Sequence, residues 1–341
     1  MLKKKSTYVM AILGATGAVG KETLEILEER KFPLESLRLF ASKRSAGGTM
    51  SCQGKEWKIE ELTPDSSFAG VDFALISATD AISRDYGQKL GAAGVIVIDD
   101  SGVWRMDNEV PLVVPEVNAQ ALQAMPRGIV AIPNCTTTPL VMALKPLHDA
   151  VGVKRVVVTT FQSVSGTGAA AMDELMDQTK DLMAFRDVKT EVYPYQIAFN
   201  LLPHIGSFND GGDCSEEVKI VKETRKILGA PALRVTATTV RVPVLRCHSE
   251  AINVELEKPL PPNEARAALA AMPGVIVYDD PGKKLYPMPL DATGKDEVYI
   301  GRVREDASIT NGLNLWVVSD NLRKGAALNA IQIAECLIER S

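Results

Sequence analysis

YVMAILGATGAVG (residues 8–20) is the stretch that decides the fold of the N-terminal part of the chain. Residues 8–13 form a short apolar run typical of a buried strand, and residues 21–29 have the periodicity of an amphipathic helix. Three glycines join the two as GxxGxxG, a variant of the dinucleotide-binding fingerprint. Such small residues let the backbone approach a pyrophosphate at the positive N-terminus of a helix. A plain tight turn is the alternative interpretation, but a place on the first strand of an α/β pattern favours a dinucleotide site.

Short apolar runs alternate with helical patterns through the first third of the chain, which predicts a parallel α/β sheet. The strand-like runs after the first are residues 37–41, 73–77 and 95–99. From about residue 154 the pattern changes to longer β-branched runs without a regular helix between them, and this predicts a second, mixed α+β domain with a broader sheet. These runs are residues 156–161, 234–244, 251–256 and 313–319. The tail over residues 324–340 has a long helical pattern that could fold back onto the first domain.

Length and composition limit the class of protein. A chain of 341 residues suggests two domains at about 150 residues each. The formal charge of -5 argues against a general nucleic-acid surface, which needs clustered Lys and Arg. No apolar run is long enough for a signal sequence or a membrane span. Five scattered cysteines and three histidines form neither a disulfide framework nor a zinc pattern, so we expect no metal and a soluble, cytoplasmic protein.

The end of the second predicted strand bears on the choice of cofactor. NAD-binding proteins usually carry an Asp or Glu there for the ribose hydroxyls, but this chain has SKRSAGG over residues 42–48. Arg44 and Ser45 suit a 2′-phosphate, so the sequence favours NADP over NAD. The alternative is a solvated basic loop.

Cys135 is the cysteine with the most reactive predicted setting. It precedes a helical pattern over residues 140–150, with Thr137 or Thr138 as the cap and Pro139 in the first turn. A helix N-terminus lowers the pKa of a thiol and can hold a developing oxyanion. The other cysteines lack this setting: Cys52 is expected in a polar loop, Cys336 on an apolar helix, and Cys214 and Cys247 beside polar stretches. A buried structural thiol remains the alternative for Cys135.

A dinucleotide site together with an activated thiol suggests one class of reaction. The thiolate adds to an aldehyde, hydride leaves to a nicotinamide, and a thioester remains for a second nucleophile. At this point several separate motifs become recognisable in order. They are GATGAVG (14–20), SKRSAGG (42–48), VPLVVPEVN (110–118), NCTTTPL (134–140), QSVSGTG (162–168), EEVK (216–219), RVPVLRCHSE (241–250), YPMP (286–289), GRVRED (301–306) and DNLRKGAALNAIQIAE (320–335). Over essentially its whole length the chain resembles the aspartate-semialdehyde dehydrogenase family.

The resemblance implies a role for each matching residue of the reaction site. Cys135 would be the nucleophile that carries a thioester, Gln162 would orient the intermediate, and His248 would be the general acid/base. Arg241 would bind the substrate α-carboxylate and Glu216 its ammonium. The residues implied in holding phosphate or substrate are Arg105, Lys219 and Asn134. The residues implied in cofactor binding are Gly14, Thr16, Gly17, Ala18, Val19, Arg44, Ser45, Ser165, Gly166 and Asn321.

Each of these residues also has a structural interpretation. Arg241 could be a surface residue of a strand, and Glu216 with Lys219 could be an i,i+3 helix pair. His204 lies among apolar residues as a structural histidine would, and His148 lies late in a helix, where no chemistry is required.

The resemblance further implies a Rossmann-like domain of residues 1–133 plus 322–341, and a catalytic and dimerisation domain of residues 134–321. The expected activity is the NADP-dependent interconversion of L-aspartyl 4-phosphate and L-aspartate 4-semialdehyde, in the synthesis of lysine, threonine, methionine and diaminopimelate. We expect a homodimer, which could pair into a tetramer. An N-acetylglutamyl-phosphate reductase is the alternative enzyme, although its acylated substrate would not need Glu216. A non-catalytic NADP-binding regulator is the alternative outside enzymes.

Overall fold

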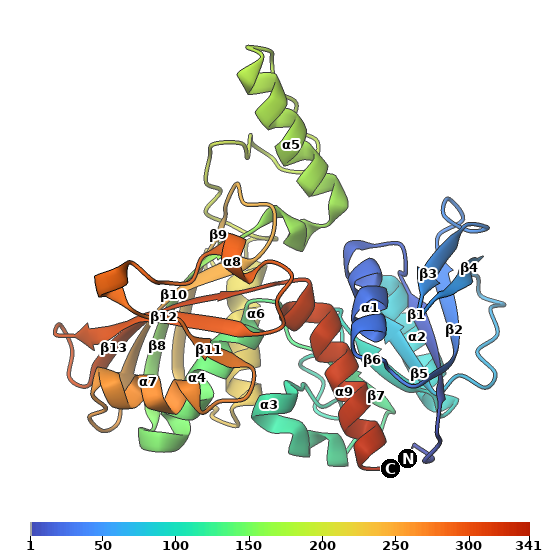
Figure 1. Cartoon of the computed structure of the whole chain (residues 1–341), viewed down its shortest axis with the longest axis horizontal. Helices are drawn as coiled ribbons and strands as arrows, with labels where there is room; N and C mark the ends of the chain where they lie inside the picture. Colours follow the sequence, from blue (N-terminus) through green and yellow to red (C-terminus); the bar gives the residue numbers. More distant parts are fainter. Residues whose placement is uncertain (1) are drawn as a thin grey trace. The chain divides into compact units, whose positions relative to one another are not determined.

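The computed structural model describes residues 2–341, which form two compact units. The first unit comprises residues 2–134 and Ala326–Ser341, and the second comprises Cys135–Gly325. Each unit has its own sheet with helices packed against it (Figure 1). The fold class predicted from the sequence, an N-terminal parallel α/β domain followed by a domain on a mixed sheet, is confirmed.

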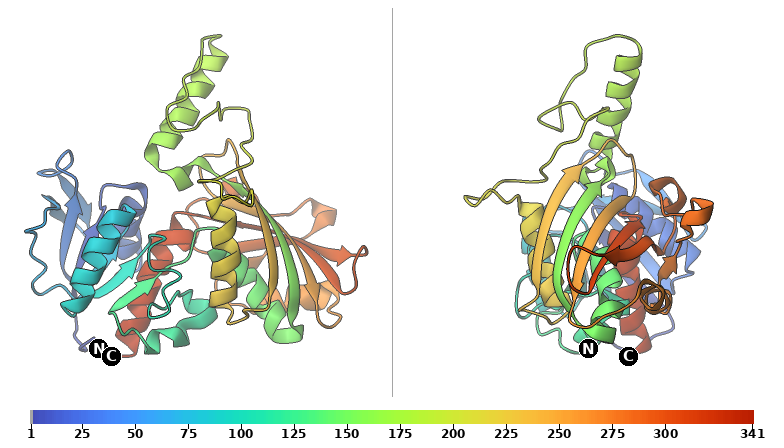
Figure 2. Two further views of the ribbon diagram at one scale, coloured as in Figure 1. Left: turned by 180° about the vertical axis from the view of Figure 1, so that it is seen from behind. Right: turned by 90° about the vertical axis from the view of Figure 1, so that its left-hand side faces the viewer.

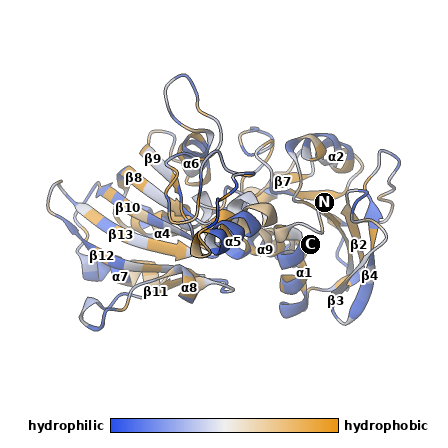
Figure 3. Cartoon of the chain, turned by 90° about the horizontal axis from the view of Figure 1, so that it is seen from above, coloured by the Kyte–Doolittle hydropathy of each residue, from blue (hydrophilic) through white to orange (hydrophobic). Residues whose placement is uncertain are grey.

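The first unit is built on a seven-stranded sheet of order β3-β4-β2-β1-β5-β6-β7. Neighbouring strands are parallel except β3 and β4, which pair antiparallel at one edge. β4 is largely hydrophilic, whereas β7 at the opposite edge is hydrophobic (Figure 3). The elements are β1 (Tyr8–Leu13), α1 (Ala18–Glu29), β2 (Leu34–Ala41), β3 (Thr49–Cys52), β4 (Lys55–Glu61), β5 (Phe73–Ile76), α2 (Asp80–Ala92), β6 (Ile96–Asp99), α3 (Pro115–Asn118), β7 (Ile129–Ala131) and α9 (Leu328–Glu339).

The C-terminal helix α9 is part of the first unit, although more than half of the chain separates it from the other elements. Leu328, Ile331 and Leu337 are buried in the same apolar cluster as the strands and α1. The Asn329 side chain donates from Nδ2 to the Val113 carbonyl at 2.8 Å. The tail therefore folds back onto the first domain, as its helical pattern predicts.

The second unit is built on a six-stranded sheet of order β11-β12-β13-β10-β8-β9. The pairs β8–β9 and β11–β12 are parallel and the other pairs are antiparallel, so the sheet is mixed. Its elements are α4 (Thr137–Val151), β8 (Val153–Gln162), α5 (Ala169–Met183), α6 (Ser215–Ile227), β9 (Arg234–Arg241), β10 (His248–Leu256), α7 (Pro262–Ala270), β11 (Val275–Val277), α8 (Pro289–Ala292), β12 (Val298–Asp306) and β13 (Gly312–Ser319).

One face of this second sheet is covered by the helices α4, α6 and α7 (Figures 1 and 2). Successive strand residues point to opposite faces. On β10, Glu250 and Ile252 are buried and Ala251 and Asn253 are partly exposed. His248 and Ser249, at the start of the strand, are both buried. The covered face thus carries a histidine and a glutamate among apolar side chains, at the end of the sheet where β8 and β9 also finish.

Two sequence predictions for the second unit are wrong. Its β-branched runs do have regular helices between them, because α5 and α6 lie between β8 and β9, and α7 follows β10. These helices carry many charged residues, which hid their apolar faces in the sequence. The strand predicted over residues 234–244 ends at Arg241, shortly before Pro243. Among the helices of residues 2–341, none is both long and apolar enough to cross a lipid bilayer.

Glu250 is a polar residue of the covered face that is buried without a hydrogen bond from any described residue to its carboxyl group. Its side chain is 1% exposed, and neither carboxyl oxygen has a hydrogen-bond partner among the residues that the structure describes. Burial raises the pKa of Glu250 well above its usual value. The folded protein therefore keeps this carboxyl protonated at a pH where the unfolded chain releases the proton, and the free energy of unfolding falls as the pH rises.

We predict that Glu250→Gln removes this loss, because an amide does not ionise in either state. The melting temperature of the variant minus that of the wild type should rise between about pH 5 and about pH 8 at fixed protein concentration, measured by scanning calorimetry. Glu255→Gln on the same strand is the control. The Lys154 ammonium lowers the pKa of Glu255, so this carboxyl is ionised in the folded and the unfolded chain over the same pH range, and the melting-temperature difference should not depend on pH. A difference for Glu250→Gln that does not depend on pH would contradict the prediction.

Candidate active site

Cys135 lies immediately before the cap of α4. The helix begins at Thr137, so Thr136 is its N-cap and Pro139 lies in its first turn. The expected cap at Thr137 or Thr138 is wrong, because both residues are already inside the first turn. Cys135 itself is partly exposed and is one of five free cysteines. The thiol thus lies where a 15-residue helix directs its first N–H groups and its positive end.

Gly325 approaches Cys135 so closely that a side chain would not fit. A Cβ added at position 325 would lie 2.9 Å from the Cβ of Cys135 and 3.2 Å from its Cα and carbonyl oxygen. These are backbone atoms and a Cβ, which cannot move aside without moving the helix start. The π-helical turn over Arg323–Ala327, which leads into α9, therefore requires glycine at this point.

His248, the first residue of β10, faces the thiol. Its Nε2 lies 3.2 Å from the Sγ of Cys135. Its Nδ1 accepts a hydrogen bond from the Ser163 backbone N–H at 3.0 Å. A ring nitrogen that accepts carries no proton, so the neutral imidazole holds its proton at Nε2, toward the sulfur. Burial lowers the pKa of His248 to about 3, and the positive charge of Arg241 acts in the same direction. The imidazole is therefore neutral at physiological pH.

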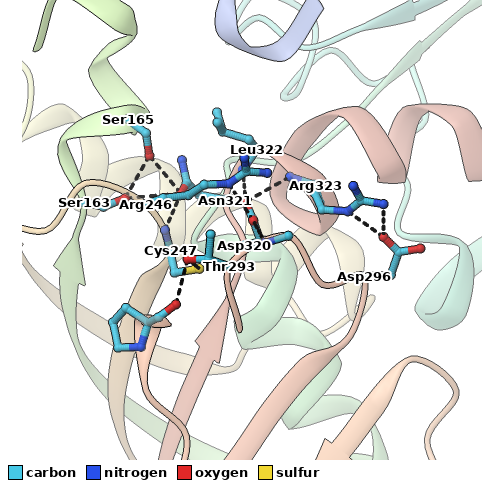
Figure 4. Close-up of polar contacts among 12 residues, drawn as sticks. Ser163, Ser165, Arg246, Cys247, Thr293, Asp296, Asp320, Asn321, Leu322 and Arg323 are labelled. Carbon is cyan, nitrogen blue, oxygen red and sulfur yellow. Dashed lines mark hydrogen bonds and ion pairs between the residues drawn. The ribbon is translucent and has the colours of Figure 1, made fainter. Parts of the chain in front are cut away.

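Asn321 connects Ser163, Ser165 and Cys247, which lie around His248 (Figure 4). Its Oδ1 accepts hydrogen bonds from the Ser163 and Ser165 hydroxyls at 3.2 and 3.0 Å and from the Cys247 N–H at 3.0 Å. The Ser163 hydroxyl also lies 3.1 Å from Nδ1 of His248. Cys247 has a φ of +73°, which is unusual for a residue other than glycine, and the bond to Asn321 helps to hold this backbone. Two residues predicted to bind cofactor, Ser165 and Asn321, thus lie in this network.

A second chain of polar contacts connects Gln162, Glu216 and Lys219. Gln162, the last residue of β8, donates from Nε2 to Oε1 of Glu216 at 3.1 Å. The Lys219 ammonium lies 3.3 Å from the other oxygen of Glu216. The i,i+3 pair considered from the sequence therefore exists on α6. It does not exclude a binding role, because Glu216 is buried and connected to Gln162 as well.

Arg241, the last residue of β9, has one guanidinium nitrogen that is hydrogen-bonded and one that has no partner in the described part of the chain. Its Nη1 donates to the Ser163 carbonyl at 2.6 Å. Its Nε is buried and has no hydrogen-bond partner among residues 2–341. Gly166 lies against the same side chains, since a Cβ there would be 3.2 Å from Nη1 of Arg241 and from Nε2 of His248. The guanidinium is thus buried beside the imidazole, and its Nε–H is a donor without an acceptor among the described residues. The interpretation of Arg241 as a surface residue is wrong, because the residue is buried.

The glycine loop in the first unit is built for close approach. Gly14 has a φ of +94°, and a Cβ there would lie 2.0 Å from the Ser77 carbonyl oxygen. A Cβ at Gly20 would lie 2.5 Å from the Gly14 and Ala15 carbonyl oxygens. Gly17 is the N-cap of α1, so the helix starts at Ala18 and includes Val19. The prediction from the sequence placed its start at residue 21, three residues too late. The Thr16 hydroxyl lies 3.5 Å from the Ser45 hydroxyl, and Arg44 beside it is exposed.

Arg105 and Asn134 also belong to the first unit and are buried. The Arg105 guanidinium donates from Nη2 to the Asp100 carbonyl at 2.8 Å and lies 4.0 Å from its carboxylate. Burial raises the pKa of Asp100 to about 6, against the opposing effects of Arg105 and the Ser77 hydroxyl. Asp100 was not among the predicted residues, although it follows the predicted strand over residues 95–99 directly.

The remaining cysteines and histidines differ from the sequence expectations in detail. Cys52 ends β3 and is buried, not in a polar loop, because its thiol faces α1 and donates to the Leu24 carbonyl at 3.5 Å. Cys214 does lie at a helix N-terminus, as the N-cap of α6, but it is fully buried. His204 stacks on the exposed Phe208, and Nδ1 of His148 accepts from the Val153 N–H at 3.1 Å.

Ser163 contacts both His248 and Arg241 and was not predicted from the sequence, although it follows Gln162 in QSVSGTG (162–168). Its contribution comes mainly from backbone N–H and carbonyl groups, which side-chain chemistry does not reveal. The described residues contain no group of three or more His, Cys, Asp and Glu side chains arranged to hold a metal.

Two family descriptions match the chain. "Semialdehyde dehydrogenase, NAD binding domain" matches residues 9–125, and "Semialdehyde dehydrogenase, dimerisation domain" matches residues 144–324. The aspartate-semialdehyde dehydrogenase of Aquifex aeolicus is 50% identical over 334 residues, 97% of this chain and 98% of that protein. The crystal structure of aspartate semialdehyde dehydrogenase II from Vibrio cholerae, complexed with ASA, is 44% identical with a TM-score of 0.96, over 98% of this chain and 99% of that one. The Candida albicans enzyme with NADP is 26% identical with a TM-score of 0.76, over 97% and 98% of the two chains.

Proposed function

The chain belongs to the aspartate-semialdehyde dehydrogenase family, and from that premise we propose that it interconverts L-aspartyl 4-phosphate and L-aspartate 4-semialdehyde through a thioester on Cys135. In the biosynthetic direction, aspartyl phosphate, NADPH and a proton give the semialdehyde, NADP and phosphate. The observation that carries this proposal is the 3.2 Å contact between the Cys135 sulfur and Nε2 of His248 at the start of α4. It supplies a nucleophile, a proton at a fixed atom and a positive helix end in one place.

The first step is attack of the Cys135 thiolate on the acyl carbon of aspartyl phosphate. A C–S bond forms, the carbonyl π electrons move onto oxygen, and their return breaks the C–O bond to phosphate, which takes up the proton of the overall equation from water as it leaves. The N–H groups at the start of α4 and the Nε2–H of His248 are the donors that stabilise the sulfur and the oxyanion. Gln162, fixed by its bond to Glu216, orients the acyl group that remains on the sulfur.

When NADPH is bound, it supplies the hydride that reduces the thioester. The former carbonyl carbon then carries a negatively charged oxygen and is still bonded to the Cys135 sulfur. The carbonyl re-forms as the C–S bond breaks, so the sulfur leaves as thiolate. The Nε2–H of His248 donates a hydrogen bond to the oxyanion and keeps its proton, because the ring is neutral and Nδ1 accepts from the Ser163 N–H. The glycine loop fits a dinucleotide, since Gly14 and Gly20 leave no room for side chains and α1 directs its N-terminus there.

Binding of the substrate follows from the charges around the thiol. The unpartnered Nε of Arg241 and the neighbouring Nη2 can hold the α-carboxylate in a bidentate pair. Glu216 is a buried acid for the free ammonium, which an N-acetylated substrate would lack. We propose that Arg105 and Lys219 hold phosphate and that Asn134 contributes to binding phosphate or substrate. These features favour the aspartyl substrate over the reductase and regulator alternatives.

The cofactor, assembly and location complete the proposal. The first unit matches an NAD binding domain, and Arg44 and Ser45 at the end of β2 favour NADP within that class. We propose a homodimer formed through the second unit, which matches a dimerisation domain. Pairing of two dimers is the alternative assembly that a molar-mass measurement distinguishes. Five free cysteines suit a reducing cytoplasm.

The activity is tested with purified protein, L-aspartate 4-semialdehyde, NADP and phosphate. NADPH absorbance should rise, and Cys135→Ala should lower kcat by more than about 10³-fold because the thioester cannot form. NADP affinity should be unchanged in that variant. Cys336→Ala, at the other partly exposed thiol, should keep wild-type activity. Wild-type turnover by Cys135→Ala would overturn the mechanism, and no turnover by the wild type would overturn the function.

Cofactor choice is tested with Arg44→Ala. Loss of a charge-assisted contact to the 2′-phosphate should raise the KM for NADP by about 10- to 100-fold and leave the KM for NAD unchanged. Lys43→Ala, its exposed neighbour, is the matched control and should change both values little. Equal effects of Arg44→Ala on the two cofactors would mean that Arg44 does not recognise the 2′-phosphate.

A further inference from the structure

The long segment that connects β8 and β9 in the second unit, residues 163–233, contacts Arg241, the proposed carboxylate-binding residue. It contains α5, which extends away from the sheet (Figures 1 and 2), and the loop that follows α5. At its return the Leu202 N–H donates to the Arg241 carbonyl at 3.0 Å, and the Arg241 N–H donates to the Leu202 carbonyl at 2.9 Å. The backbone of Arg241 is therefore positioned by this connecting segment as well as by its pairing with β8.

The loop after α5 is anchored by a single buried carboxylate. Glu174 of α5 accepts hydrogen bonds from three successive backbone N–H groups: Glu191 at 2.9 Å, Val192, and Tyr193 at 3.4 Å. Gln178, one turn later, donates to Glu174 at 3.2 Å and to the Lys189 carbonyl at 2.7 Å. The side-chain oxygen Oε1 of Gln178 accepts hydrogen bonds from the backbone N–H groups of Ile197 and Ala198. These contacts fix the loop on both sides of Tyr193.

Tyr193 is the loop residue that reaches the site. Its ring centroid lies 6.0 Å from the guanidinium carbon of Arg241. Its hydroxyl donates to Oγ1 of Thr167 at 3.0 Å, in the same short turn as Gly166, which lies against Arg241 and His248. The ring also packs against the small apolar cluster of Val164, Leu175 and Leu202. An aromatic face at this distance attracts a guanidinium and limits the water around it.

We propose that Tyr193 is a positioning residue, which Glu174 holds against the Arg241 guanidinium so that the Nε edge of Arg241 stays directed at the substrate α-carboxylate. This inference rests on the proposed function, because it takes Arg241 to bind that carboxylate. The contacts of Tyr193 near the site are with Arg241 and Thr167. Its loss should therefore weaken substrate binding and leave the chemical steps almost unchanged.

The test is steady-state kinetics of semialdehyde oxidation with NADP and phosphate. Tyr193→Ala should raise the KM for the semialdehyde by about tenfold, with kcat within about twofold of wild type and the KM for NADP unchanged. Tyr193→Leu, which keeps bulk without a π face, should raise the KM similarly. Tyr193→Phe should stay near wild type, because the ring remains. Glu174→Gln should share the rise in KM, since an amide cannot accept all three N–H groups.

Tyr195→Ala is the matched control, because Tyr195 lies two residues away in the same loop and is 67% exposed. It should keep wild-type values for both substrates. A wild-type KM for the semialdehyde in Tyr193→Ala or in Tyr193→Leu, with circular dichroism showing a folded protein, would overturn the inference while the function stands. Absence of turnover in the wild type would instead overturn the proposed function itself.

Discussion

The hydrogen bond from the Ser163 N–H to Nδ1 of His248 is the contact on which the rest of the site depends. It leaves the imidazole proton at Nε2, the atom that faces the Cys135 sulfur. Because this donor is a backbone group at the end of β8, the sheet itself helps to orient the ring. Burial and the nearby Arg241 charge keep the ring neutral, which makes it a hydrogen-bond donor to a developing anion rather than a standing cation.

The fold of the second unit brings the required groups together at one end of one sheet. Gln162 and Arg241 end the parallel strands β8 and β9. His248 begins β10, which lies between β8 and β13 and is antiparallel to β8. All three side chains lie on the face that α4 covers, and Cys135 precedes α4. Gly325 permits the close approach to Cys135, and Asn321 ties β10 to the turn after β8. Rigid elements thus fix the geometry, while the longest loop contributes Tyr193 only at the substrate end.

The sequence was most informative where local chemistry and local structure coincide. The strand, glycine loop and helix at residues 8–29 and the thiol before α4 follow from short-range patterns, and the structure agrees with them within a few residues. Contacts between distant residues could not be predicted in this way. The resemblance implies that Asn321 and Ser165 bind the cofactor, and their bonds within the network behind His248 became apparent only in the structure. Ser163 acts through its backbone, and Glu174 and Tyr193 depend on how a loop folds back, for which no periodic pattern exists. The helices α5 and α6 were missed because their charge obscured their apolar faces.

The central claim is that the acyl group is carried on Cys135, and trapping the intermediate tests it most directly. The protein is mixed with L-aspartate 4-semialdehyde and NADP in phosphate-free buffer, quenched in acid, digested and analysed by peptide mass spectrometry. Without phosphate to resolve it, a thioester should accumulate together with one burst of NADPH per active site. We predict an aspartyl adduct on the peptide that contains Cys135 and on no other cysteine. A burst of NADPH with the adduct on another residue, or with no adduct on the protein, would contradict the claim.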